Sequence, residues 1–372
     1  MKGLVIWAYS DCRSVMATYR ALMAAANCPT LLVLLHGDAD HCGLDLRIQT
    51  GFREDEFSDV PREYIELNFE KGRQIIATHP GWNHLFSDYQ RQDVVRQLIA
   101  EAKSRGEHVG IINEAPCNMA SGRRWWLKEV FFRTVLPRKI RSAVRAADFF
   151  ANCSGDDVKA QKVAGWTTEK IVPFGYFPPP IEGARCVLRT TNKPFHILAT
   201  GILSRYRGAD CLVEALRILK SWGVPYRATI TQDGELLPIL KAKAERCGLP
   251  IDFAGFVQLA DLIKLYETCT VYVGAGRDEP WGMRLNDALN CGAPLIVSSG
   301  MGGRKLVDDY GCGLVFERRR PADLARQLKA LATDEELYSA CARRAVDAAR
   351  KIAPASQAAW LLSSIRKYEG WR

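Results

Sequence analysis

The chain has 372 residues, of which 48% are hydrophobic and 25% are charged. This composition is typical of a soluble globular protein, and the length suffices for two domains. Its apolar runs are far shorter than a membrane span, and the N-terminus lacks the pattern of a signal peptide. The twelve cysteines include no CxxC pair, which favours a reducing compartment, so we expect a cytoplasmic protein.

Strand-like and helical patterns alternate through the first half of the chain. Helical periodicity predicts helices over residues 14–26 and 90–105. Short apolar runs predict strands over residues 4–7, 31–35, 74–78, 109–113, 149–152 and 170–173. This alternation is typical of an α/β domain built on a parallel sheet.

A break in both patterns, with three consecutive prolines at 178–180, separates the first half from the second. Strands are then predicted over residues 196–200, 227–231, 252–256, 271–274, 295–298 and 314–317, with helices at 209–221 and 238–247 and a mostly helical end. We therefore predict two Rossmann-like domains, at 1–175 and 195–351, joined by a linker at 176–194. Ligands of such folds bind at the carboxyl ends of the strands, here in a cleft between the halves.

Residues 279–294 carry the most informative pattern in the chain. Glu279 shortly precedes Gly282, and a second acid, Asp287, follows on a predicted helix. Two carboxylates so placed can bind two separate hydroxyl-bearing parts of one ligand. The backbone N–H groups around Gly282 and Met283 open the helix and offer a site for a diphosphate. This combination suits a nucleotide sugar.

The second half of the chain resembles the retaining GT-B glycosyltransferases of family 4. Its motifs stand in the family's order: a glycine loop at 201–208, a strand-end turn at 232–235, a base-contacting segment at 253–257, the E-x7-E motif at 279–294 and a glycine turn at 300–307. The resemblance implies the GT-B fold, an α/β architecture of two Rossmann-like domains with parallel sheets facing a central cleft. It also implies that a C-terminal helix at 352–372 crosses back to the N-terminal domain.

The resemblance gives each residue of the donor site a role. Glu279 would bind hydroxyls of the donor sugar and Asp287 those of the ribose, while Arg207 would stabilise the leaving diphosphate. Glu279 and Arg207 are thus catalytic candidates. The implied donor-binding set comprises Gly201, Arg205, Arg207, Val257 (at the base), Glu279, Gly282, Met283 and Asp287.

The phosphate loop departs from the family pattern. Ile202 stands where the family usually has Arg, and Arg207 stands where it usually has Lys. Arg207 can still bind a diphosphate in bidentate geometry. The missing charge would have to come from Arg205 or Arg304. Asp287 replaces the usual Glu and reaches one methylene less far.

The resemblance implies a retaining glycosyltransferase that moves a sugar from a nucleotide-diphosphate sugar to a lipid-linked or saccharide acceptor in cell-surface glycan synthesis. Retention in this family is attributed to a front-face substitution, which needs no enzyme nucleophile. Positive groups at the diphosphate would stabilise the leaving group, so we expect no divalent metal and no other cofactor.

The N-terminal half is expected to bind the acceptor. His79 follows the predicted strand at 74–78 at the ligand-binding end, where it could assist proton transfer or bind a sugar phosphate. His84 is a second, weaker candidate. Glu114 ends the predicted strand at 109–113 and is a candidate contact to the acceptor.

A DxD pattern at Asp38 and Asp40 follows the second predicted strand. Carboxylates at this spacing could bind a metal. The pattern lies far in sequence from the donor motifs, and we interpret it as a polar loop with no metal.

Residues 123–145 hold much of the chain's net charge of +9, with eight basic residues, one acid and interleaved aromatic side chains. Such a helix can bind an anionic membrane surface, so we predict peripheral binding at the inner face of the plasma membrane. A solvated helix with a buried aromatic face and an RNA-binding patch are the alternatives, although no nucleic-acid motif accompanies the segment. The predicted contact residues are Arg123, Arg124, Trp125, Trp126 and Lys128.

Other functions on the same fold stay open. One is a sugar-nucleotide epimerase. A phosphorylase is disfavoured because no cofactor-lysine motif is visible. A non-catalytic nucleotide-sugar-binding partner of another transferase is the third, since Ile202 and Lys305 alter the diphosphate site.

Overall fold

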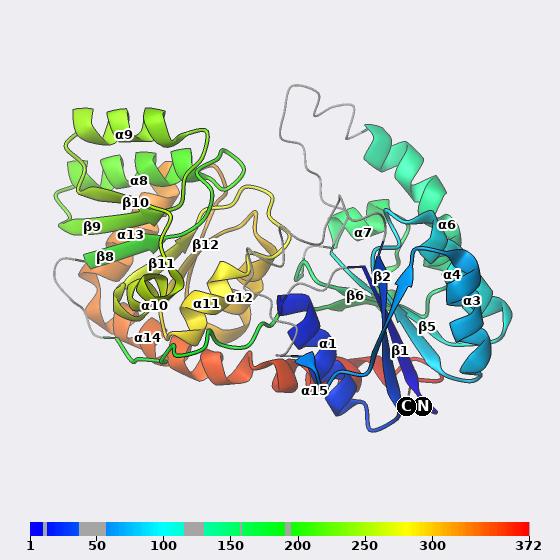
Figure 1. Ribbon diagram of the computed structural model, residues 1–372. Helices are drawn as coiled ribbons and strands as arrows, with labels where there is room; N and C mark the ends of the chain where they lie inside the picture. The colour runs from blue at the N-terminus through cyan, green and yellow to red at the C-terminus, as the bar shows by residue number, and fades with distance from the viewer. Residues whose placement is uncertain (10–12, 37–56, 115–129, 157, 190–194, 372) are drawn as a thin grey trace. The chain divides into compact units, whose positions relative to one another are not determined.

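The computed structural model describes residues 1–9, 13–36, 57–114, 130–156, 158–189 and 195–371. The chain forms two compact α/β units (Figure 1). Unit 1 comprises Met1–Pro179 together with Ala353–Arg372, and unit 2 comprises Pro180–Ile352. The C-terminal segment thus belongs to the N-terminal unit, as the family resemblance implies.

Unit 1 is built on a parallel sheet, in which the described strands follow the order β3-β2-β1-β4-β5-β6-β7. Most of its strands are fully buried apolar runs, as expected for a sheet covered on both faces. The strands are β1 (Leu4–Ala8), β2 (Thr30–His36), β3 (Arg62–Glu66), β4 (Asn83–Phe86), β5 (Val109–Asn113), β6 (Phe149–Asn152) and β7 (Ile171–Pro173).

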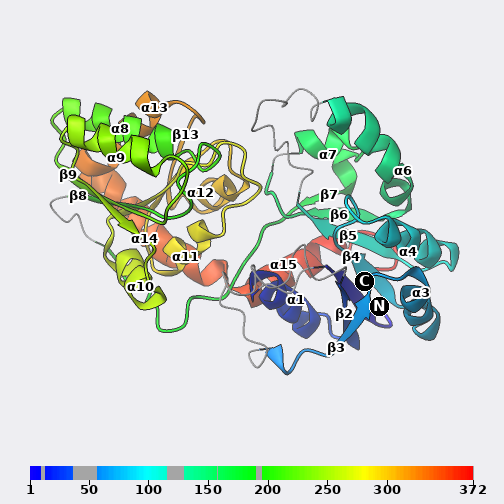
Figure 2. The same ribbon diagram turned by 45° about the horizontal axis from the view of Figure 1, so that its top comes forward.

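Helices cover both faces of this sheet (Figure 2). α3, α4 and α6 pack side by side on one face, and α1 packs against α15 on the other. The helical elements are α1 (Arg13–Ala25), α3 (Phe69–Thr78), α4 (Asp93–Ser104), the π-helical turn η2 (Phe131–Val135), α6 (Leu136–Ala146), α7 (Lys159–Val163), η3 (Thr168–Lys170) and α15 (Pro354–Ile365).

The residues after α15 fasten the chain's end to unit 1. The Trp371 indole packs edge-on against Phe149 at a centroid distance of 4.7 Å and donates a 3.0 Å hydrogen bond to the Asp148 carboxylate. The Asn83 amide donates to the Gly370 carbonyl at 2.8 Å. These contacts join positions more than 200 residues apart and explain why the C-terminal helix completes the N-terminal unit.

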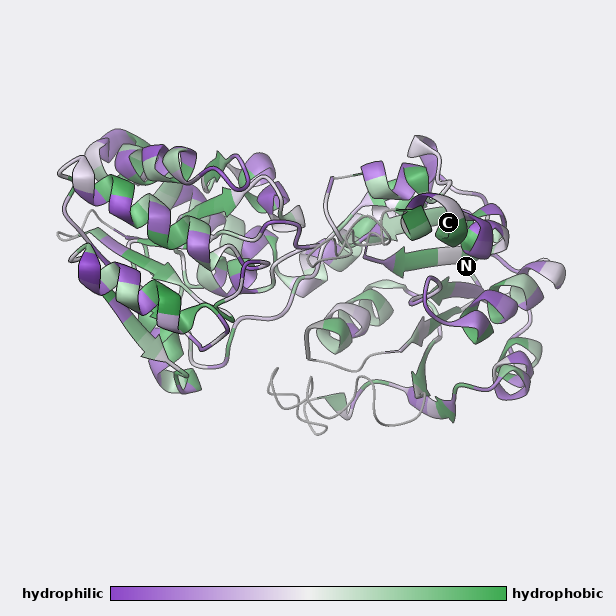
Figure 3. Ribbon diagram, turned by 90° about the horizontal axis from the view of Figure 1, so that it is seen from above, coloured by the Kyte–Doolittle hydropathy of each residue, from purple (hydrophilic) through white to green (hydrophobic). Residues whose placement is uncertain are grey.

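Unit 2 is a second parallel sheet, in the order β10-β9-β8-β11-β12-β13 over the described strands. In Figure 3 the strands are mostly hydrophobic, whereas the helices alternate between hydrophobic and hydrophilic faces. The strands are β8 (Phe195–Ala199), β9 (Tyr226–Thr231), β10 (Ile251–Gly255), β11 (Val271–Gly274), β12 (Leu295–Ser298) and β13 (Gly313–Phe316).

The helices of unit 2 also lie on two faces, with α8, α9 and α13 on one and α10, α11 and α14 on the other (Figure 2). Buried side chains of α8 and α13, mostly leucines and alanines, pack with those of the strands in one hydrophobic core. The elements are α8 (Ala209–Ser221), α9 (Leu237–Arg246), α10 (Leu259–Thr268), α11 (Arg284–Asn290), η4 (Gly302–Arg304), α12 (Lys305–Tyr310), α13 (Pro321–Thr333) and α14 (Glu335–Lys351).

The second part of the predicted linker is attached to unit 2. Arg189, only 8% exposed, donates hydrogen bonds of 2.5–2.9 Å to four backbone carbonyls at the ends of α10 and α11. Arg185 pairs with Glu267 nearby. The described residues 180–189 therefore belong to the structure of unit 2.

The prediction of a strand at 74–78 is wrong, because these residues end helix α3. Their β-branched side chains favour a strand. Asn68, however, caps the helix by accepting hydrogen bonds from the N–H groups of Glu70 and Lys71. Ile75 and Ile76 then fall on the buried face of the helix. The strands β3 and β4 were missing from the prediction.

Candidate active site

The residues predicted to bind the donor all follow the carboxyl ends of strands in unit 2. Gly201, Arg205 and Arg207 come after β8, Val257 after β10, and Glu279 after β11. Because the strands are parallel, these loops meet at one edge of the sheet.

Glu279 is held rigidly at this edge and is only 8% exposed. Its N–H donates to the Gly300 carbonyl, and its carbonyl accepts from the Gly302 N–H, each at 3.0 Å. The loop after β11 is thereby tied to the loop after β12. The Glu279 carboxylate forms an ion pair with Arg207, whose side chain is 44% exposed. Two of the three catalytic candidates, Glu279 and Arg207, thus contact each other.

The loop after β8 is shaped to bring Arg207 to Glu279. Gly208 has a φ of 71°, and a Cβ there would lie 1.9 Å from the Ala275 carbonyl oxygen. Only glycine fits this close approach. The Tyr206 carbonyl accepts a 3.0 Å hydrogen bond from the Arg277 N–H, which joins the same two loops.

Gly282, Met283 and Asp287 lie on the turn into the short helix α11 and on the helix itself. Gly282 has a φ of 96°, and a Cβ there would lie 2.3 Å from the Met301 side chain. The Trp281 indole donates a 2.8 Å hydrogen bond to Asn286, which fixes the turn. Asp287 is partly exposed on the first turn of α11.

A polar cluster that the sequence did not predict lies beside this turn. Thr200 shares hydrogen bonds with the hydroxyls of Tyr266, at 3.1 Å, and Tyr272, at 2.9 Å. Arg284, the first residue of α11, is hydrogen-bonded to Tyr266 and lies close to Asp287. One signal was available: Arg284 is a charged residue in a helix whose other side chains are mostly buried.

Two arginines at this edge interact electrostatically. Burial, and then the neighbouring charge of Arg284, lower the pKa of Arg207, while Tyr206 and Tyr272 act against this shift. Burial also disfavours the charge of Arg284, but Tyr266, Tyr272 and Asp287 outweigh it and raise its pKa. An arginine guanidinium is not deprotonated in proteins, so both side chains are cationic at neutral pH.

The remaining donor-site candidates are more exposed. Val257 is partly exposed, and Phe256 beside it is 74% exposed, so an aromatic face is open where the base is expected. Arg205 is exposed. Arg304 pairs with Asp308 at 3.7 Å.

His79 does not lie where the sequence placed it. It is the C-cap residue of α3, and its Nδ1 lies 2.8 Å from the Ile75 carbonyl oxygen. β4 begins shortly afterwards, at Asn83, so His79 lies at the amino edge of the sheet. Its assignment to acceptor binding and catalysis assumed that a strand ends at residue 78, and these residues are helical instead.

The assignment of His84 to the acceptor site is wrong because its ring is fully buried within β4. Its Nδ1 accepts a 3.1 Å hydrogen bond from the Trp7 indole. Burial, with a smaller contribution from His79, lowers the pKa of His84 to about 3. His84 is thus a neutral core residue.

Glu114 does follow the carboxyl end of β5, as predicted. Burial raises its pKa, and Asp88 adds to the shift, whereas Arg91 and a hydrogen bond with Tyr176 oppose it. Burial likewise raises the pKa of Asp88, which follows β4. Unit 1 therefore presents two partly desolvated carboxyl groups at the edge that corresponds to the donor edge of unit 2.

The predicted membrane-contact residues Arg123, Arg124, Trp125, Trp126 and Lys128 lie outside the described residues, as do Asp38 and Asp40 of the DxD pattern. The segment that follows is described. Val130, Phe131 and Val135 are each about half exposed, at 52%, 48% and 47%. Exposed basic side chains lie on η2, at Arg133, and continue along α6, at Arg138, Lys139, Arg141 and Arg145.

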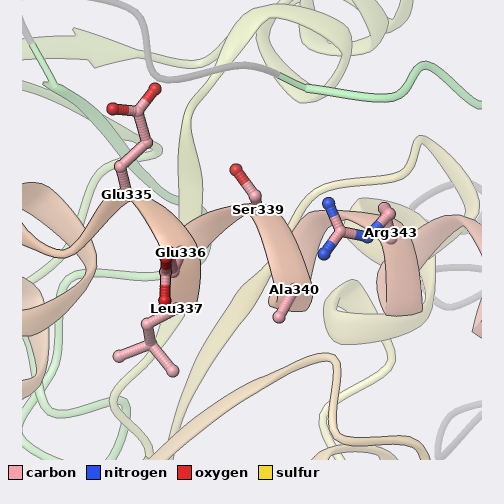
Figure 4. A pocket seen from close by; sticks show the side chains of 6 residues that line it. All are labelled: Glu335, Glu336, Leu337, Ser339, Ala340 and Arg343. Atoms are coloured by element: carbon pink, nitrogen blue, oxygen red, sulfur yellow. The ribbon is translucent and has the colours of Figure 1, made fainter.

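Three further observations concern membrane spans, metal sites and surface hollows. Within the described part of the chain, no helix is long and apolar enough to cross a membrane. In the same residues, no group of three or more His, Cys, Asp or Glu side chains could hold a metal ion. A surface hollow on α14 is lined by one helix alone, from Glu335 to Arg343 (Figure 4), and includes none of the donor-site residues.

Comparison with known proteins identifies a family that matches part of the chain. Residues 184–347 match the family Glycosyl transferases group 1. A relative from Mycobacterium tuberculosis, the GDP-mannose-dependent alpha-(1-6)-phosphatidylinositol dimannoside mannosyltransferase, is 31% identical over 190 residues. That match covers 48% of this chain and 48% of the relative, so the chain spans about half the length of the curated relatives it matches.

Solved structures match nearly the whole chain in fold. Anabaena Alr3699/HepE in complex with UDP is 15% identical with a TM-score of 0.68, covering 99% of this chain and 100% of that one. The apo form of the lipopolysaccharide outer core galactosyltransferase WaaB is 12% identical with a TM-score of 0.67, covering 98% and 99%. The protein therefore has the GT-B fold, and its residues 184–347 match the glycosyl transferases group 1 family.

Proposed function

We propose that the protein is a retaining glycosyltransferase that transfers a sugar from a nucleotide-diphosphate sugar to a lipid-linked or saccharide acceptor. The observation that carries the proposal is the buried Glu279 carboxylate paired with Arg207, with Asp287 on the adjoining helix. A carboxylate that can bind sugar hydroxyls thus lies next to a cation that can bind the diphosphate. Both lie at the carboxyl edge of the sheet, in the segment that matches the glycosyl transferases group 1 family. The names of the relatives support a nucleotide-sugar donor.

In the proposed reaction, an acceptor hydroxyl oxygen bonds to the anomeric carbon of the sugar. The bond from that carbon to the diphosphate oxygen breaks, and its electron pair stays on the diphosphate. The hydroxyl proton passes to the leaving diphosphate on the same face. Arg207 stabilises the charge that develops there. Because an arginine supplies this charge, we expect transfer to continue when EDTA removes divalent metals.

The acceptor would bind in unit 1, where Glu114 and Asp88 follow β5 and β4. A lipid-linked acceptor would fit a protein that binds an anionic membrane through the exposed apolar turn at 130–135 and the basic side chains of α6. Such an acceptor would place the reaction in cell-surface glycan synthesis at the cytoplasmic face of the membrane.

The proposal is tested by incubating the protein with UDP-, GDP- and ADP-sugars and measuring release of the nucleotide diphosphate. We expect release from one base class, with the anomeric configuration retained in the product. Binding of a donor without release from any of them would contradict the transferase. Conversion of the sugar without release would instead favour an epimerase.

A further inference from the structure

The diphosphate site of this protein has a shortage of positive charge. The loop position at which the family resemblance places an arginine holds Ile202, an apolar side chain that is 56% exposed. Of the two arginines in this loop, Arg207 is already paired with Glu279, and Arg205 is exposed to solvent. A nucleotide diphosphate brings at least two negative charges to a partly desolvated edge, which is costly unless cations meet them.

Arg284 is placed to supply this charge. It stands two residues after Gly282, on the turn that joins the Glu279 loop to α11. Its partners are the Tyr266 hydroxyl and, three residues further along the helix, Asp287. In the sequence Arg284 stands between Glu279, proposed to bind the sugar, and Asp287, proposed to bind the ribose, and the diphosphate of the same donor joins these two parts.

The surroundings of Arg284 fix its orientation. Tyr266 is 0% exposed and Tyr272 is 3% exposed, and both hydroxyls converge on Thr200, the residue after β8. Tyr272 lies in β11 and Tyr266 in α10, so three elements of unit 2 hold this hydroxyl cluster. A guanidinium resting on a rigid polar cluster loses little further freedom when it binds an anion.

The two arginines also repel each other. Arg207 and Arg284 are close enough for the charge of one to disfavour the charge of the other. Glu279 is the ion-pair partner of Arg207, and Asp287 lies close to Arg284. Both acids are also proposed to bind hydroxyl groups of the ligand. A bound dianion would relieve this repulsion, which would favour a diphosphate over a neutral ligand.

We propose that Arg284 is a second diphosphate-binding residue and takes the place of the loop arginine that Ile202 replaces. Thr200, Tyr266 and Tyr272 are its positioning residues. The proposal rests on the proposed function, because it assigns this edge to a nucleotide-diphosphate donor.

The test compares ligands that differ only in phosphate. UDP, GDP and ADP are titrated first to find the base that the unaltered protein binds. The Kd of that diphosphate, of its monophosphate and of its nucleoside is then measured for Arg284→Met and Arg284→Lys. We expect Arg284→Met to weaken diphosphate binding by about 30-fold and nucleoside binding by less than about twofold, with partial recovery in Arg284→Lys.

Matched controls separate binding from folding. Arg217→Met removes an arginine from α8 that pairs with Glu214, and it should leave all three Kd values unchanged. Tyr266→Phe removes the hydrogen bond but keeps the charge, so it should weaken diphosphate binding by about fivefold. This variant keeps the test informative if Arg284→Met fails to fold.

Two outcomes overturn the proposal. An unchanged diphosphate Kd in Arg284→Met would show that Arg284 does not contact the diphosphate. If Arg284→Met weakened the binding of the nucleoside and of the diphosphate equally, Arg284 would only support the fold. Failure of the proposed function looks different, because the unaltered protein would then bind none of the three nucleoside diphosphates or would bind a nucleotide sugar without releasing its diphosphate.

Discussion

The carboxyl edges of the two sheets differ in their chemistry, although both sheets are parallel and covered by helices. In unit 2 the edge carries paired charges, with Glu279 against Arg207 and Arg284 beside Asp287. In unit 1 it carries Glu114 and Asp88, whose pKa values burial raises. The first edge suits a ligand with charged phosphates, and the second suits neutral hydroxyls that accept or donate hydrogen bonds. The same architecture can thus bind two different substrates because the loops differ.

The strongest test of this difference is Glu279→Gln. Losing the carboxylate should lower the kcat/KM of transfer by at least about 100-fold, since one preorganised polar group at a reacting centre has effects of this size. Asp278→Asn is the control, because the Asp278 carboxylate pairs with Arg318 and Arg319 instead. The circular dichroism spectrum should be unchanged in both variants. Near-normal transfer by Glu279→Gln would refute the site.

The second prediction concerns the interior of unit 1, and it follows from the low pKa of His84, about 3. The unfolded chain takes up a proton below about pH 6.5, whereas folded His84 does not, so stability falls as the pH drops through this window. The loss should be about 1.4 kcal/mol per pH unit, or about 2 kcal/mol at pH 5. Urea unfolding at several pH values measures it.

His84→Gln keeps an acceptor for the Trp7 indole but removes the titration, so its unfolding free energy should depend less steeply on pH. An equal slope in the variant and the unaltered protein would contradict the assignment. His196, buried in unit 2 with its pKa lowered to about 4, is the matched position, and His196→Gln should act in the same direction.

The third prediction contrasts the exposed faces of the two units. Arg138→Gln with Arg141→Gln on α6 should weaken binding to anionic vesicles by about 30-fold, because each arginine near such a surface contributes about 1 kcal/mol. Arg326→Gln with Arg350→Gln on unit 2 is the matched control and should have no effect. Flotation with vesicles containing phosphatidylserine measures this. Equal effects of both pairs would mean that net charge alone drives binding.

The smallest expected effect is at Glu114. Glu114→Gln should raise the acceptor KM by about fivefold and leave the donor KM unchanged, because one hydrogen-bonding partner changes character at the acceptor edge. Initial rates with each substrate varied in turn separate the two constants. A change in the donor KM alone would assign this edge to the donor and remove the contrast between the units.

The sequence predicted unit 2 well because its elements are locally unambiguous. The strands at 271–274 and 295–298 are buried apolar runs bounded by small residues, and their predicted bounds are those of β11 and β12. In unit 1 the same reasoning missed strand β4, because its first residues are polar. β4 begins with the polar pair Asn83 and His84, whose burial depends on partners distant in sequence.

The donor site could be predicted only as far as its motifs are contiguous. Glu279, Gly282 and Asp287 lie within nine residues, and Arg207 follows a recognisable glycine loop. The cluster around Arg284 could not be found in this way. Its hydrogen bonds join Thr200 to Tyr266 and Tyr272, which follow it by 66 and 72 residues in the sequence. Only the packing of α10 and β11 against β8 brings these side chains together.

Arg189 determines where the chain can be cut. A fragment that began at β8 would leave bare the carbonyls of Tyr266, Glu267, Cys269 and Cys291, which Arg189 now satisfies. A fragment of residues 180–352 keeps this clamp, and it is the one we would express to study the donor half in isolation. Unit 1 cannot be expressed as one continuous fragment, because its last helix follows unit 2 in the sequence. The two parts of unit 1 would have to be joined by circular permutation.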